Sequence, residues 1–206
     1  MPVLVVANPK GGAGKSTLAT QMAGYWASQG HKVMLGDADR QQSSRLWLSL
    51  RGPELPPIAG WKVGPDAVAR PPHGTTHAVI DTPAGLHGKR FDEILRAADR
   101  LLVPVQASVF DIYAAQEFLD RIAGERKLQG LRIGLVGMRV DERTRAAEQL
   151  REFLQRLPHP LLGMLRPTTN YAHMAAHGLT LWDLRAAHAE RDLQQWQGIT
   201  AWADAD

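Results

Sequence analysis

Cysteine is absent from the 206 residues, which excludes disulfides, thiolate zinc sites and iron–sulfur clusters. Long apolar runs are absent as well, and none approaches the roughly 18 residues that a membrane-spanning helix requires. Residues 1–7 contain no Lys or Arg, and Asn8-Pro9 interrupts the opening apolar run. The start is therefore expected to be a buried strand and not a signal peptide. Together these absences favour a cytoplasmic protein.

The remaining composition is that of a soluble globular chain. Hydrophobic residues make up 44% and charged residues 22%, which are ordinary values for such proteins. A chain of this length suits one domain with a proper core and leaves little room for a second. We therefore expect residues 1–206 to form a single domain.

The net charge of +3 is unevenly distributed along the chain. Residues 121–166 contain ten Arg and Lys against five Asp and Glu, whereas residues 171–206 contain two Arg against five acids. A basic stretch of this kind is one way to build a face for polyanions. Charge alone favours the simpler interpretation of a solvated helical surface.

Short apolar runs alternate with longer amphipathic ones. The runs expected to form strands are Val3–Ala7, Lys32–Gly36, His77–Ile80, Arg100–Val105 and Arg132–Gly137. The runs expected to form helices are Ser16–Ser28, Gln41–Leu50, Arg90–Ala98, Asp111–Gln129, Glu142–Leu157 and Leu181–Trp202. Alternating βα units predict an α/β fold, a mostly parallel twisted sheet with helices on both faces in three layers.

One region, between the second and third predicted strands, is less regular. Residues 51–72 are rich in proline and read as loop, with Trp61–Val63 as a short edge strand. Among the tryptophans, Trp26 and Trp47 are expected in the core, and Trp196 and Trp202 are candidates for exposure to a partner.

The strongest motif is a glycine-rich loop placed directly between a strand and a helix. It reads Gly11, Gly12, Ala13, Gly14, Lys15, Ser16, Thr17. Backbone N–H groups of such a loop turn inward around phosphate oxygens, and the helix N-terminus adds its dipole. Lys15 is placed to reach the β- and γ-phosphates and Ser16 to bind Mg²⁺. The alternative, a turn that only caps a helix, does not explain the whole context.

Lys10 precedes the loop. Lys-Gly-Gly-x-Gly-Lys-Ser/Thr resembles the deviant Walker A motif of the ParA/MinD group of P-loop ATPases. The resemblance implies binding and hydrolysis of ATP with Mg²⁺, and an ATP-sandwich homodimer in which Lys10 acts on the partner's nucleotide. A second ammonium there would offset charge on the transferring phosphoryl group. The alternative is a solvated loop lysine.

Two acids end the second predicted strand. Asp37-Ala-Asp39-Arg40-Gln41 looks like the Asp-x-Asp-Pro-Gln segment of the same group. By this match Asp39 positions the attacking water, and Asp37 is a supporting acid near the metal. Arg40 stands where the family commonly has proline, which puts the geometry of this turn in doubt. The alternative for both acids is an N-cap of the following helix.

The third predicted strand also ends in an acid, Asp81, followed by Thr-Pro-Ala-Gly85. This pattern resembles a Walker B strand with its carboxylate directed toward Mg²⁺, followed by the family's switch segment. By that resemblance the metal residues are Ser16, Asp37 and Asp81, and the Gly85 N–H senses the γ-phosphate.

Residues after Gly85 resemble the ParA/MinD group less specifically. The segments around Met138, Arg139 and Pro167 lie where the family contacts the adenine base. Non-specific DNA binding, common in ParA-like proteins, rests on Arg and Lys contacts to phosphates. The candidates here are Arg139, Arg143, Arg145 and Arg151.

The leading hypothesis is therefore a ParA-like ATPase that positions DNA or other cargo. It would be a homodimer with ATP, bind duplex DNA on the nucleoid, and be stimulated by a ParB-like partner. One alternative is a metabolic P-loop enzyme of the ligase or synthetase type. The other is a MinD-like ATPase at a membrane surface, which the acidic C-terminal residues disfavour.

Overall fold

The computed structural model describes residues 1–63, 73–85 and 87–205. Within them lies a seven-stranded sheet in the order β3-β2-β4-β1-β5-β6-β7, and every pairing is parallel. Its strands are β1 (Val3–Val6), β2 (Val33–Asp37), β3 (Ile58–Trp61), β4 (His77–Asp81), β5 (Arg100–Gln106), β6 (Arg132–Met138) and β7 (Leu161–Met164). The five predicted strands and the predicted fold class are confirmed.

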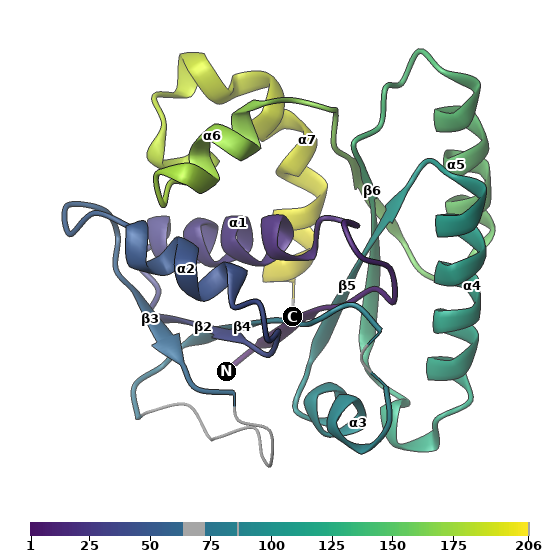
Figure 1. Cartoon of the computed structure of the whole chain (residues 1–206). Coiled ribbons are helices and arrows are strands. Elements are labelled where there is room, and N and C mark those ends of the chain that lie inside the picture. The colour runs from purple at the N-terminus through teal and green to yellow at the C-terminus, as the bar shows by residue number, and fades with distance from the viewer. Residues whose placement is uncertain (64–72, 86, 206) are drawn as a thin grey trace.

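Helices cover both faces of the sheet (Figure 1). One face packs on α3 (Lys89–Arg96), α4 (Val109–Ala123) and α5 (Arg145–Arg156). The other packs on α1 (Lys15–Ser28), α2 (Ser43–Leu50), α6 (Asn170–Ala176) and α7 (Ala186–Asp204). All four residues of β1 are buried, because a central parallel strand covered on both faces needs apolar side chains at every position.

Helix boundaries differ from the predicted ones for local reasons. The helix expected over Asp111–Gln129 starts earlier, since the Ser108 hydroxyl caps it by accepting from the Asp111 N–H. It ends at Ala123, before Gly124, and a short 3₁₀ helix, η1 (Arg126–Leu128), follows. A second 3₁₀ helix, η2 (Leu181–Asp183), occupies the start of the region predicted as one long C-terminal helix.

The edges of the sheet were the least predictable part. The expected edge strand at Trp61–Val63 is shifted to β3, which pairs with β2 in the register Val33↔Ile58. The last part of that predicted loop, residues 64–72, lies outside the described residues. The strand β7 was not predicted. It is short, and a Cβ on its Gly163 would lie only 2.7 Å from the Gln195 carbonyl of α7, so glycine permits this close approach.

The suggestion that Trp196 is exposed is wrong. Its side chain is 1% exposed, because α7 lies across the sheet, and its indole N–H donates to the Tyr171 hydroxyl at 2.8 Å. Trp202 is half-buried against the same apolar cluster. Trp26 and Trp47 lie in the core as predicted.

Within the described ranges, no helix is both long enough and apolar enough to span a bilayer.

Candidate functional site

The glycine-rich loop connects β1 to α1 at the carboxyl edge of the sheet. Gly12 and Gly14 have φ angles of 72° and 96°, in the left-handed region that side chains disfavour. A Cβ on Gly14 would also lie 2.6 Å from the Met138 Cε. Both glycines are therefore needed by the backbone, and the loop turns into the N-terminus of α1 as a phosphate cradle does.

Lys15, the first residue of α1, is buried in this loop. Its Nζ donates to the Lys10 carbonyl at 2.8 Å. Burial lowers the pKa of Lys15, while the charges of Asp81 and Asp39 act in the opposite direction. The ammonium thus lies between the loop and the two acids, where phosphate oxygens would be its natural partners.

Three further residues hold the loop, and the sequence reasoning missed their role. The buried Asn8 accepts from the Lys10 N–H at 2.6 Å and donates to the Pro104 carbonyl at 2.6 Å. Gln106, at the end of β5, donates to the Gly12 carbonyl at 2.7 Å. The Gly85 N–H, the proposed γ-phosphate sensor, donates to the Pro9 carbonyl at 2.9 Å. The only sequence signal for Gln106 was its place at a strand end.

Asp37 and Asp39 differ in their surroundings. Both Asp37 oxygens accept from backbone N–H groups, those of Asp39 at 2.9 Å and Arg45 at 3.1 Å. Burial raises the pKa of Asp37, and these N–H donors counteract it. Arg45 lies in the first turn of α2. The Asp37 carboxylate, at the end of β2, therefore caps the N-terminus of that helix. Asp39 instead closes a tight turn, accepting from the Gln41 N–H at 3.0 Å.

Asp81 ends β4 and is 1% exposed. Its Oδ2 accepts a hydrogen bond of 2.7 Å from the hydroxyl of Ser44, which is fully buried on α2. Its Oδ1 is buried and has no hydrogen-bond partner among the described residues. Burial raises the pKa of Asp81 to about 6, while the side chains of Ser16 and Ser44 act to lower it. Ser44 was not singled out from the sequence.

These residues fit the Mg²⁺ that the resemblance implies. The orphaned Asp81 Oδ1 is a hard oxygen donor, the type that Mg²⁺ prefers. Ser16 adjoins it at the start of α1. Asp37 lies beside Asp81 in the register of β2 and β4, but its two oxygens are already occupied by backbone donors. The assignment of Ser16, Asp37 and Asp81 as metal residues remains a prediction, with Asp37 the least free of the three.

Lys10 has a different environment from Lys15. Its side chain is half-buried, and its Nζ lies 6.0 Å from the ring centroid of Phe110. Phe110 is 78% exposed, and its neighbours on α4, Val109 and Tyr113, are 60% and 71% exposed. The Lys10 ammonium therefore adjoins an exposed apolar patch at the carboxyl edge of the sheet.

The two segments expected near an adenine base are joined to each other. The Leu165 N–H donates to the Gly137 carbonyl at 2.7 Å, and the Val140 N–H donates to the Leu165 carbonyl at 2.8 Å. Met138, between them, contacts the glycine-rich loop at Gly14, whereas Pro167 is exposed. The fold thus brings these segments to the loop, and base contact itself stays a prediction.

The four arginines proposed for DNA lie around the start of α5. Arg143 forms a two-bond pair with Asp141, at 2.9 and 2.8 Å, which holds the pKa of that carboxyl at about 2. Arg151 pairs with Glu142 at 3.3 Å. Arg139 is exposed with a φ of 52°, and Arg145 is exposed as well. The charges of two of the four arginines, Arg143 and Arg151, are therefore partly neutralised by neighbouring acids.

Comparison with known proteins agrees with this geometry. Residues 4–181 match the family described as the CobQ/CobB/MinD/ParA nucleotide binding domain. The maintenance of carboxysome distribution protein A of Halothiobacillus neapolitanus is 27% identical over 192 residues, which cover 89% of this chain and 88% of that protein.

Two solved structures share the fold. A plasmid partition protein of Borrelia burgdorferi, bound to AMPPNP, superposes with a TM-score of 0.73 at 19% identity, covering 98% of this chain and 99% of that one. The MinD cell division protein of Aquifex aeolicus gives a TM-score of 0.73 at 18% identity, covering 100% and 98%. The expected enzyme class, an ATPase, agrees with the family match. The chain belongs to the CobQ/CobB/MinD/ParA nucleotide-binding family, as a P-loop ATPase of its ParA/MinD group.

Proposed function

We propose that this protein is a cytoplasmic positioning ATPase that binds ATP with Mg²⁺, closes as a homodimer around it, and in that state binds DNA without sequence preference. Hydrolysis, stimulated by a ParB-like partner, reopens the dimer. A relative that maintains carboxysome distribution and a structural neighbour that partitions plasmids support cargo positioning as the role.

The observation that carries the proposal is the contrast between two lysines of one loop. Lys15 is buried with its Nζ on the Lys10 carbonyl, a position for a lysine that serves the chain's own nucleotide. Lys10 adjoins the exposed ring of Phe110, where it can meet a second copy. A second copy that covers the patch of Val109, Phe110 and Tyr113 would remove its apolar area from water. This burial would stabilise the dimer by about 25 cal/mol per Å² of apolar area.

The residues divide the reaction between them. The loop N–H groups and Lys15 hold the phosphates, and Ser16 and Asp81 are the side chains best placed to hold Mg²⁺, with Asp37 beside them. When bound, the metal offsets the charge that develops on the phosphoryl oxygens. Asp39 keeps one oxygen without a hydrogen-bond partner among the described residues, so it is free to orient the attacking water. Lys10 of the second copy adds positive charge to the same phosphate.

Retention on non-specific duplex DNA tests the proposal, measured with ATP·Mg²⁺, with ADP·Mg²⁺ and without nucleotide at two salt concentrations. Retention that requires ATP and falls with salt is expected, since phosphate contacts release counterions. Equal retention in all three states would overturn the DNA role. Turnover that depends on a small acid or amine would instead favour a ligase-type enzyme, and nucleotide-dependent binding to vesicles a membrane role.

A further inference from the structure

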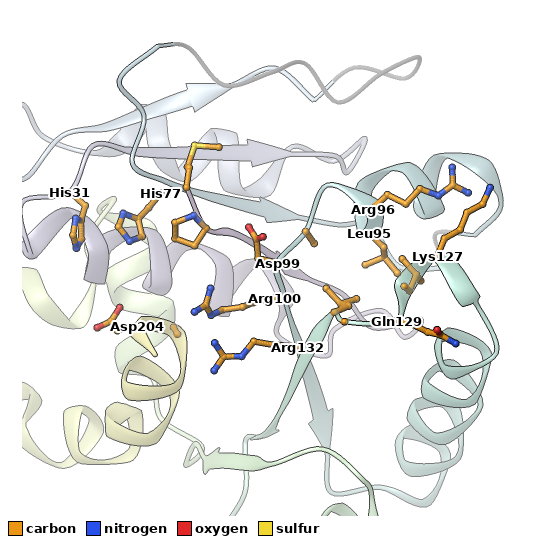
Figure 2. Close-up of a pocket in the computed structure, with 17 residues that line it drawn as sticks. His31, His77, Leu95, Arg96, Asp99, Arg100, Lys127, Gln129, Arg132 and Asp204 are labelled. Carbon is orange, nitrogen blue, oxygen red and sulfur yellow. The ribbon is translucent and has the colours of Figure 1, made fainter. Parts of the chain in front are cut away.

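Helix α3 runs from the carboxyl edge of the sheet to its amino edge. Its last residue, Arg96, is exposed and lines a cavity of about 980 Å³ at the amino edge (Figure 2). Its second residue, Arg90, is half-buried at the other end, where its Nη2 donates to the Ala38 carbonyl at 3.2 Å. Ala38 directly follows β2 and stands between Asp37 and Asp39. The first turn of α3 is therefore tied to the segment that carries the two acids.

The hydrogen bond from Arg90 fixes the peptide group that leads into Asp39. A peptide group is planar, so the Ala38 carbonyl and the Asp39 N–H turn together. The N–H donates to the Asp37 Oδ1 at 2.9 Å, and the carbonyl accepts from Arg90. The preceding peptide group is held as well, since the Ala38 N–H donates to the Asp81 carbonyl at 2.9 Å. The backbone in front of Asp39 is therefore held from both sides, and Arg90 supplies the hold on the carbonyl side.

The Ala38 carbonyl depends on Arg90. Ala38 is 3% exposed, and its carbonyl has no other donor in the part of the chain that the structure describes. A buried carbonyl without a donor is unfavourable, so without Arg90 the peptide group would turn toward water or another donor. The Asp39 side chain starts at the next Cα, and such a turn would therefore redirect its carboxylate.

The guanidinium of Arg90 has no competing partner. Among the described residues it forms no ion pair with a carboxylate, and its buried Nε has no hydrogen-bond partner. Buried donors are nearly always paired, and a guanidinium that served only to anchor a helix would be expected to use more of its five N–H groups. The contact with the Ala38 carbonyl is therefore what this side chain is placed to make.

We propose that Arg90 is a positioning residue for ATP hydrolysis that acts through Asp39. It holds the peptide group between Ala38 and Asp39 in the orientation that directs the Asp39 carboxylate to the attacking water. The inference rests on the role of Asp39 in the proposed function. The ordinary alternative is that Arg90 only fastens α3 to the end of β2, which predicts a loss of stability and no specific loss of catalysis.

Steady-state ATP hydrolysis by the full chain tests the proposal, with kcat and KM determined separately. Arg90→Met removes the guanidinium and keeps most of the apolar stem. It should lower kcat by about 10- to 100-fold, since misplacing a reacting group by about 1 Å costs up to roughly 100-fold. KM and the affinity for a fluorescent ATP analogue should not change, because Arg90 contacts Ala38 and not the glycine-rich loop. Arg90→Lys keeps a charged donor and should recover most of the lost kcat.

The matched control is Arg96→Met, the same change at the other end of α3, which should keep the wild-type kcat. A double-mutant cycle then separates positioning from a structural role. In single-turnover measurements, Arg90→Met/Asp39→Ala should hydrolyse ATP at the rate of Asp39→Ala alone, because the effects of residues that act as a unit do not add. A purely structural role of Arg90 would slow the double variant further. Melting temperatures confirm that each variant is folded.

The outcomes separate the inference from the function on which it rests. A wild-type kcat in Arg90→Met overturns the inference and leaves the positioning ATPase intact. A loss of nucleotide affinity in Arg90→Met also overturns it, since Arg90 would then hold the nucleotide itself. A double variant slower than Asp39→Ala overturns it as well. A wild-type rate in Asp39→Ala overturns the role of Asp39 in the proposed function, and with it the step through which Arg90 acts.

Discussion

The hydroxyl of Ser44 donates a 2.7 Å hydrogen bond to Oδ2 of Asp81, and both side chains are buried. Ser44 belongs to the first turn of α2, which Asp37 caps. The start of this one helix therefore touches both acids that end β2 and β4. Any change in the acids that accompanies nucleotide binding has a direct route into α2.

Replacing Ser44 with Ala should weaken Mg²⁺ binding. Loss of a hydrogen bond that orients a metal-binding side chain costs about tenfold or more in metal affinity. The buried Oδ2 left without a donor should also cost about 1–3 kcal/mol of unfolding free energy. A titration of Mg²⁺ against a fluorescent ATP analogue, together with urea unfolding, measures both. Ser43→Ala, one residue earlier and exposed, is the control and should change neither.

Asp39→Ala should keep ATP binding and lose hydrolysis by about 100-fold or more, as expected when a group that directs the nucleophile is removed. The ATP-bound dimer should then accumulate. Asp37→Ala should behave differently, because Asp37 caps α2, and its loss should cost about 1–2 kcal/mol of stability. Single-turnover hydrolysis and thermal melting distinguish the two. A wild-type rate for Asp39→Ala would remove Asp39 from the reaction.

Lys10→Ala should retain nucleotide binding by the monomer but fail to form the ATP-dependent dimer. The reason is that the Lys10 side chain adjoins the exposed Phe110 and not the buried interior of its own loop. Lys15→Ala should lose nucleotide binding altogether, because Lys15 is the buried lysine of the loop. Sedimentation velocity with and without ATP measures how much of each variant is dimeric. A Lys10→Ala dimer of wild-type stability would contradict the assignment of Lys10 to the partner's site.

The pair of Arg51 and Asp183 should dominate the stability of the contact between α2 and η2. Their side chains are 4% and 1% exposed at 2.8 Å, and Arg51 also donates to the Gly178 carbonyl. Burial acts to raise the pKa of Asp183, but hydrogen bonds from Arg51 and Thr180 outweigh it and leave the pKa lowered. Arg51→Ala leaves a buried charge unpaired and should cost about 3–5 kcal/mol in urea unfolding.

The matched control is the exposed pair of Arg156 and Glu152 on α5, at 3.5 Å with side chains 78% and 59% exposed. Arg156→Ala should change the free energy of unfolding by less than about 0.5 kcal/mol. Similar losses for the two arginines would mean that burial does not decide the effect.

Acid should destabilise the fold through His77. Burial lowers its pKa from 6.5 to about 4, and the neighbouring His31 adds to the shift. The unfolded chain therefore binds a proton below pH 6.5 that the folded chain does not take up until about pH 4. The stability due to neutral His77 is present above pH 6.5 and declines as pH falls toward 4.

Because the ring is partly exposed, this effect should be limited to about 1 kcal/mol. The raised pKa values of Asp37 and Asp81 act with the opposite sign, since those carboxyls keep their protons to higher pH when folded. The informative quantity is therefore the difference between the wild type and His77→Gln in urea unfolding at pH 7.5 and 5. A difference that does not change with pH would contradict the role of His77.

Local chemistry determined the nucleotide site. Gly12, Gly14 and Lys15 follow a run of buried apolar residues, and only such a strand–loop–helix context aligns N–H groups with a phosphate. Asp37 and Asp81 were also predictable from local sequence. Each ends a strand, and parallel strands have their carboxyl ends at the same edge of the sheet. Mainly apolar runs of four to six residues predicted the five inner strands for a related reason, because strands covered on both faces bury apolar side chains along most of their length.

Tertiary structure decided what depends on contacts between distant segments. Ser44 is an ordinary serine in sequence, and only the packing of α2 against β4 places it on Asp81. The sequence left Trp196 as a candidate for contact with a partner, but α7 packs on the sheet and buries this side chain. Arg100 and Arg132 come from different strands, and only the parallel register of β5 and β6 sets them side by side. Periodicity reports which face of an element is apolar, but it carries no information on which other element will cover that face.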